Sequence, residues 1–133
     1  MMTNIQPRVL LSTLWIFVLF NTILRDLHEF PTEGYIEEMM NLNLSEELML
    51  LFAFVVEVPI AMIVLARILS PTWNKWMNTI AVVLTSLGIL YTLPTGHLDE
   101  FFFAAASATA FVFIIRTAWR LPVLESTYEL SPN

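Results

Sequence analysis

Residues 48–69 read LMLLFAFVVEVPIAMIVLARIL, an apolar run whose only charged residues are Glu57 and Arg67. A helix needs about 17 to 25 predominantly apolar residues to cross the roughly 30 Å of hydrocarbon in a bilayer. This run has that length, and Ser70-Pro71 marks its end because proline cannot continue a helix. The stretch therefore predicts a transmembrane helix.

Three further stretches have the same character, and they cover residues of about 7–30, 76–93 and 101–119. Turn or helix-breaking signals follow them: Pro31, Pro94-Thr95-Gly96 and Arg120-Leu121-Pro122. None shows the ten-residue alternation of a membrane β-barrel, and a helix satisfies its own backbone hydrogen bonds in lipid. The sequence predicts an all-α integral membrane bundle of four transmembrane helices, in a single domain over residues 1–133.

Composition supports the same solvent. Of the 133 residues, 57% are hydrophobic and only 14% are charged, whereas soluble domains are about a quarter charged. A small globule keeps too much surface to hide that many apolar side chains from water. Six basic residues stand against twelve acidic ones, which argues against nucleic acid as a partner. The lack of cysteine excludes disulfides, thiolate metal sites and cysteine nucleophiles.

Basic residues near the helix ends predict the orientation. If the N-terminus is cytoplasmic, only Arg25 falls on the outer side. The five basic residues on the cytoplasmic side are Arg8, Arg67, Lys75, Arg116 and Arg120. Cytoplasmic loops carry an excess of Lys and Arg, so both the N- and C-termini are expected in the cytoplasm.

The loop and the tail differ in character. In the outer loop, residues 31–47, apolar residues recur at helical spacing, which is typical of a short interfacial helix. These residues are Tyr35, Ile36, Met39 and Met40, with Glu37 and Glu38 on the opposite side. The tail, residues 123–133, is more polar and is expected to be flexible.

Glu57 is the most informative single residue. It lies near the predicted bilayer midplane, where a charge costs roughly 2.5 to 3.5 kcal/mol. Ala53 and Ala61, one turn away on either side, form a narrow face suited to close packing. Pro59 leaves the carbonyl of Val55 without a donor and predicts a hinge. Two interpretations stay open: a proton or cation site, or a neutral acid that hydrogen-bonds a neighbouring helix.

Asn21 and Arg25 are the other intramembrane candidates for a proton or cation site. They share one face of the first helix with His28, at spacings of four and three residues.

A second set of residues has the chemistry of metal ligands. Residues 26–30 read DLHEF and residues 97–101 read HLDEF, both at the predicted outer surface. If the two helices are neighbours, four side chains could bind a divalent metal: Asp26, His28, His97 and Asp99. The spacing matches no catalytic motif such as H-E-x-x-H. Ordinary ion pairs with Arg25, and acids at a helix N-terminus, are the favoured interpretation.

Small side chains line the last two predicted helices. Asn78, Ala81, Thr85, Gly88 and Thr92 follow one another at roughly heptad spacing, and Ala104, Ser107 and Ala108 continue the theme. Such stripes favour helix packing over a substrate path.

Four strings carry a resemblance to a known family: STLWIFVLFN (12–21), RDLHEF (25–30), EVPIAM (57–62) and LDEFFFA (98–104). The chain resembles, over nearly its whole length, a family of small uncharacterised four-helix membrane proteins of bacteria and archaea, classified as a domain of unknown function. The resemblance implies the fold and a multi-pass location in a prokaryotic plasma (inner) membrane. It implies no activity.

Small multidrug transporters offer a second comparison, in architecture only. They share the size, the four helices and a lone membrane glutamate. Their glutamate lies in the first helix, however, whereas Glu57 lies in the second predicted helix.

The leading hypothesis is a binding, accessory or structural membrane component that self-associates or joins a membrane-protein partner, with no cofactor. The alternative is a proton- or cation-coupled transporter or channel that uses Glu57. A third hypothesis is a metal-dependent membrane enzyme that holds a divalent ion at the outer residues. The sequence favours a non-enzymatic role.

Overall fold

The structure, a computed structural model, describes residues 5–92 and 96–131. The regular secondary structure in these ranges is entirely helical, with no strand. Within them six helices follow one another: α1 (Pro7–Glu29), α2 (Tyr35–Asn41), α3 (Glu46–Ile68), α4 (Pro71–Thr92), α5 (Leu98–Trp119) and α6 (Leu121–Leu130). The predicted all-α class is confirmed.

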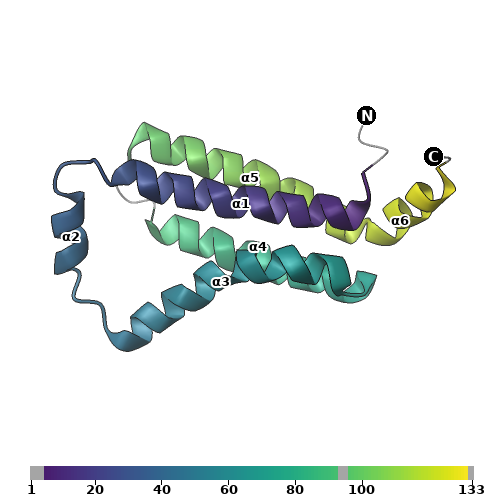
Figure 1. Cartoon of the computed structure of the whole chain (residues 1–133), viewed down its shortest axis with the longest axis horizontal. Helices are drawn as coiled ribbons and strands as arrows, with labels where there is room; N and C mark the ends of the chain where they lie inside the picture. The colour runs from purple at the N-terminus through teal and green to yellow at the C-terminus, as the bar shows by residue number, and fades with distance from the viewer. Residues whose placement is uncertain (1–4, 93–95, 132–133) are drawn as a thin grey trace.

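Four long helices form the body of the molecule (Figure 1). Around the bundle they follow the order α1, α3, α4, α5, and each packs against the next, with α5 closing on α1. Only residues 69 and 70 separate α3 from α4, so these two helices form a tight antiparallel hairpin. The first and last helices of the chain, α1 and α6, meet at one end of the bundle, and α2 lies at the other end (Figure 1).

The distribution of side chains is inverted relative to a soluble protein. Trp15, Leu11 and Ile114 are fully buried, but so are Asn74 and Asn78. The outside carries large apolar side chains on every long helix, among them Phe20, Phe54, Val83, Leu87 and Val112. Water would reject such a surface, whereas lipid accepts it. The fold is that of a membrane protein.

Three of the described helices are long and apolar enough to span a membrane: α1, α3 and α5. Helix α4 has 22 residues, a comparable length, but Asn74, Lys75, Asn78 and Thr85 make it more polar. Three of the four predicted spans are therefore supported by their length and apolar composition, whereas α4 is not among them.

Two predicted helix starts are wrong. Helix α4 begins at Pro71, not at residue 76, because proline fits the first turn of a helix. The backbone N–H of Asn74 already donates to the Ser70 carbonyl at 2.8 Å. Helix α5 begins at Leu98 rather than residue 101. The predicted last residue of the third span, Leu93, and the turn residues Pro94 and Thr95 lie outside the described residues.

The flexible tail predicted for residues 123–133 is also wrong over most of its length. Residues up to Leu130 belong to α6, whose first turn contains Pro122. Leu121 is fully buried, and the Glu125 carboxylate forms an ion pair with Arg8 at the start of α1. A contact between residues so far apart in sequence anchors the tail. Residues 132 and 133 lie outside the described part of the chain.

The short helix predicted inside the outer loop is confirmed as α2. It begins after Gly34, whose φ of 84° lies in the left-handed region that glycine adopts without strain. The rings of Phe30 and Tyr35 lie 5.9 Å apart, edge to face, and connect α2 to the end of α1.

Helices α3 and α4 approach each other closely at Gly88. A Cβ atom added there would lie 2.9 Å from Cγ1 of Val55. Val55 belongs to the side of α3 that faces the bundle, together with the buried residues Pro59, Met62 and Ala66. The absence of a side chain at residue 88 is therefore what lets α3 pack against α4.

We predict that Gly88→Ala lowers the melting temperature of the detergent-solubilised protein, although alanine favours helix. Overpacking costs about 1 to 3 kcal/mol, against a gain of about 1 kcal/mol in helix propensity. Val55→Ala removes the obstructing methyl groups, so the double variant should be more stable than the two single losses added together. Strictly additive melting shifts would contradict this account of the contact.

Candidate functional site

Hydrogen bonds join three helices in the half of the bundle nearest the termini. The Trp15 indole donates to Asn78 Oδ1 at 2.7 Å, and the Asn78 amide donates to the Asn74 carbonyl at 2.7 Å. Asn74 in turn donates to the carbonyls of Ala66 and Leu69. These buried polar groups are satisfied by protein partners, which is what a structural network in lipid requires.

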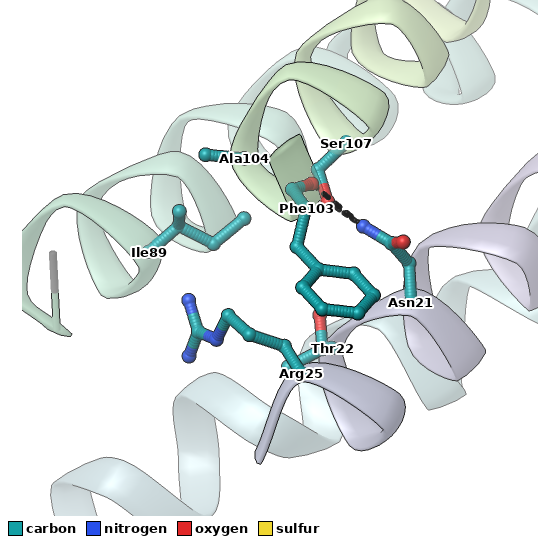
Figure 2. Close-up of a pocket in the computed structure, with 7 residues that line it drawn as sticks. All are labelled: Asn21, Thr22, Arg25, Ile89, Phe103, Ala104 and Ser107. Carbon is teal, nitrogen blue, oxygen red and sulfur yellow. Dashed lines mark hydrogen bonds between the residues drawn. The ribbon is translucent and has the colours of Figure 1, made fainter. Parts of the chain in front are cut away.

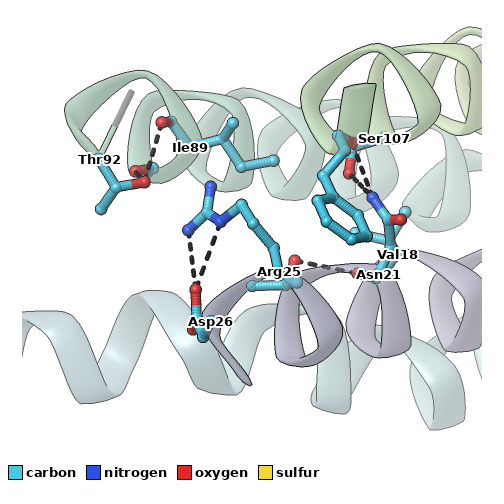
Figure 3. A network of polar contacts seen from close by, with 10 residues as sticks. Val18, Asn21, Arg25, Asp26, Ile89, Thr92 and Ser107 are labelled. Atoms are coloured by element: carbon cyan, nitrogen blue, oxygen red, sulfur yellow. Dashed lines mark hydrogen bonds and ion pairs between the residues drawn. The ribbon is translucent and has the colours of Figure 1, made fainter. Parts of the chain in front are cut away.

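A second polar cluster lies in the opposite half, between α1 and α5. The Asn21 amide donates to the Phe103 carbonyl and to Ser107 Oγ, both at 2.7 Å (Figure 2). One turn further along α1, the Arg25 guanidinium donates to Asp26 at 3.1 and 3.3 Å (Figure 3). Arg25 is 9% exposed. The two candidates on the predicted face of α1 therefore both enter the cluster.

Two carboxyl groups meet beside Arg25. Glu29, at the end of α1, lies close enough to Glu100 of α5 and to Tyr35 of α2 for their side chains to interact. Glu100 is only 2% exposed. The cluster thus places the Arg25 guanidinium near a pair of carboxyl groups that come from two different helices.

Nearby carboxyl groups also affect the pKa of the Tyr35 hydroxyl. Burial raises this pKa, and the nearby Glu29 and Asp26 carboxylates raise it further. The hydroxyl therefore stays protonated and can donate to Glu29. This contact ties α2 to the C-terminal end of α1, where Glu29 lies near Glu100 of α5.

The space inside the cluster is narrow. Its lining consists of Asn21, Thr22, Arg25, Ile89, Phe103, Ala104 and Ser107 (Figure 2), and it is too tight to hold a water molecule. The Arg25 side chain lies between α1 and α4, with Ile89 on the facing helix (Figure 3). The geometry suits a packed polar contact better than a binding site for a small molecule.

The four metal candidates lie at the same end of the bundle, but they are used differently. His28 Nε2 lies 3.4 Å from Asp99 Oδ2, so the ends of α1 and α5 are neighbours, as the hypothesis requires. Asp26 pairs with Arg25, and His97 is exposed just before α5. Within the ranges that the structure describes, no three His, Asp or Glu side chains come close enough to hold a metal ion.

The Glu29–Glu100 pair was not among the residues singled out from the sequence. Both acids lie at one predicted membrane level in the strings DLHEF and HLDEF, which was the available signal. Their pairing depends on the rotation of α1 relative to α5, and the sequence does not specify this rotation.

Glu57 lies elsewhere, on the outside of α3. Its side chain is exposed, and it forms no hydrogen bond or ion pair with any residue that the structure describes. The inward side of α3 is formed by Val55, Pro59 and Met62 instead. Glu57 therefore does not join Asn21 and Arg25, and it does not line the narrow space beside them.

Pro59, the predicted hinge, is buried within α3, and the helix continues through it. Because proline has no N–H, residue 59 cannot donate the usual helical hydrogen bond to the Val55 carbonyl. Whether α3 bends here during function stays a prediction.

Comparison with known proteins gives one match. Residues 3–125 match the model of a family described as a family of unknown function, DUF6326. No curated protein matches the chain, and no solved structure matches it.

We predict that Arg25→Leu strongly lowers the melting temperature, because it leaves the neighbouring carboxyl groups without their cation. Removing one partner of a buried ion pair costs about 3 to 5 kcal/mol, and the partial exposure of Asp26 places the expected loss below that range. Adding Glu100→Gln should recover part of the loss. The exposed Arg116, changed to Leu, is the control. Equal melting shifts for Arg25→Leu and Arg116→Leu would refute the role assigned to Arg25.

Proposed function

We propose that this chain, which belongs to the family of unknown function DUF6326, is a membrane protein with four spans. It acts as a binding or accessory component. It joins another membrane protein side by side, through the outer face of α3. The observation that carries the proposal is the exposed, unpaired Glu57 in a strongly apolar helix.

A fourth span is supported by the way α4 divides its residues. Its polar side chains, Asn74, Asn78 and Thr85, are buried, while Val83 and Leu87 are exposed. At 1.5 Å per residue, its 22 residues measure about 33 Å, which matches the bilayer core. A helix that hides its polar face within the bundle can present an apolar surface to lipid despite a moderate composition.

A cytoplasmic location of both termini is supported by the grouping of basic residues at one end of the bundle. Arg8 donates to the Leu69 carbonyl, and Lys75 Nζ lies 3.9 Å from the centre of the Trp119 ring. Lys and Arg concentrate on the cytoplasmic side, and tryptophan is enriched at interfaces. The family resemblance favours the plasma membrane of a prokaryote.

A lateral binding role follows from the cost of leaving Glu57 alone. An ionisable group near the bilayer centre costs roughly 2.5 to 3.5 kcal/mol and is usually paired or turned inward. In a single chain, Glu57 does not turn inward and has no partner among the described residues. A helix from another molecule that supplies a hydrogen bond would remove this cost, and Ala53 beside Glu57 leaves room for its approach.

A proton- or cation-coupled transporter that uses Glu57 has less support. Trp15, Val18 and Ile114 are fully buried in the middle of the bundle, and Glu57 lies on its outside. A path through a single chain would have to cross this packed interior and still reach Glu57 on the outside. Transport along an interface between molecules would in any case begin with the same lateral association.

Single cysteines test the four spans, since the chain has none of its own. We expect a membrane-impermeant thiol reagent to label Glu33→Cys and His97→Cys in intact cells. Gln6→Cys, Ser70→Cys and Ser126→Cys should react only after the membrane is permeabilised. Equal labelling of residues 70 and 97 would mean that α4 does not cross the membrane.

A photo-crosslinking amino acid tests the binding role. Placed at Ile60 on the outer face of α3, it should form an adduct with a protein of discrete mass in native membranes. Val112 on α5 is exposed at a similar height in the bundle and serves as the control, at which lipid adducts are expected. If residue 60 also reacts only with lipid, the proposed function fails.

A further inference from the structure

The outer face of α3 carries a regular pattern that the bundle does not use. Leu50, Ala53, Glu57, Ile60 and Val64 follow one another at spacings of three, four, three and four residues. This is the a/d spacing of a heptad repeat, along which two helices pack as a coiled coil. Leu50 is 60% exposed, Ile60 38% and Val64 59%. We refer to these five residues as the α3 seam.

The seam is distinct from the surface that holds α3 in its own chain. Val55, Pro59, Met62 and Ala66 form the inward side and contact α1 and α4. Figure 1 shows the first half of α3 leaning away from α1 and α5. All five seam residues are exposed, so no described element covers the seam. An uncovered face with helix-packing periodicity needs an occupant, or it remains in contact with lipid.

The chemistry of Glu57 selects the occupant. A protonated carboxyl group has both a donor and an acceptor, so two such groups satisfy each other without a basic partner. In a dimer whose two-fold axis runs along the membrane normal, the same residue lies at the same depth in both molecules. In a parallel coiled coil, residues at a positions face each other, and Glu57 occupies the central a position of the seam.

We propose that the α3 seam binds the α3 seam of a second copy of this chain, with the two Glu57 carboxyl groups sharing protons in the dimer interface. This inference rests on the proposed lateral binding function and names its partner. Ala53 lets the two helices approach one turn from the pair, on the side of the outer surface. The polar pair fixes the register, because a shift along the seam would leave both carboxyl groups in contact with apolar side chains.

Neighbouring positions on α3 provide a matched test by disulfide crosslinking in membranes. Leu50 and Leu51 are 60% and 56% exposed, but only Leu50 lies on the seam. We expect Leu50→Cys and Ile60→Cys to give a product of twice the chain mass under oxidation, and Leu51→Cys to give little. Equal yields at residues 50 and 51 would overturn the seam as the interface.

Variants of Glu57 test the carboxyl pair. Glu57→Gln keeps a donor and an acceptor and should dimerise, whereas Glu57→Leu should associate about tenfold more weakly, which corresponds to about 1.4 kcal/mol. Mixed with the unchanged chain under a different tag, Glu57→Lys should copurify through a charge pair. Two tagged forms of Glu57→Lys should not copurify with each other. Dimers that form equally well with leucine or lysine in both copies would refute the pair.

The outcomes separate this inference from the proposed function. A discrete adduct at Ile60 with a different protein would retain lateral binding and overturn the second copy as partner. A monomer in which residue 60 reacts only with lipid would overturn both. A dimer crosslinked at Leu50 and Ile60, but lost with Glu57→Leu, supports both.

Discussion

The structure depends on one constraint: the hydrocarbon core of a bilayer offers polar groups no hydrogen bonds. A polar side chain in the bundle is therefore costly unless it finds a partner within the protein. Trp15 with Asn78 and Asn21 with Ser107 meet this requirement across pairs of helices. The same requirement explains the apolar exterior, since lipid accepts what water would reject. It also makes Glu57, exposed and unpaired in the single chain, the residue that demands an explanation.

The two polar regions of the protein answer the constraint in different ways. Around Arg25, opposite charges compensate one another inside the chain, because the guanidinium pairs with Asp26 and lies near Glu29 and Glu100. Because the space there is narrow, we interpret this cluster as a structural contact that holds α1, α5 and α2 together. At Glu57 none of the residues that the structure describes provides such compensation, so we assign Glu57 to contact with another molecule.

Helix α3 serves two interfaces because it has two usable faces. The inward face packs closely on α4, where Gly88 leaves room for Val55. The outward face repeats small and branched side chains on either side of Glu57, and helix association in lipid relies on such close packing and on hydrogen bonds rather than on hydrophobicity. A second copy offers an identical seam, so one sequence feature would satisfy both molecules at once.

The sequence alone determined the four long helices and their approximate lengths, because their length is set by the thickness of the bilayer and by hydrogen bonds local to each helix. It also determined that Asn21 and Arg25 share a face, since that follows from helical periodicity. It misjudged the tail, because α6 is anchored by the distant contact between Glu125 and Arg8. Only the tertiary structure decided that Glu57 faces outward and that Glu29 meets Glu100. Helix α3 is apolar on all sides, so its pattern cannot tell inside from outside, and the rotation of one helix against another depends on packing between residues far apart in the chain.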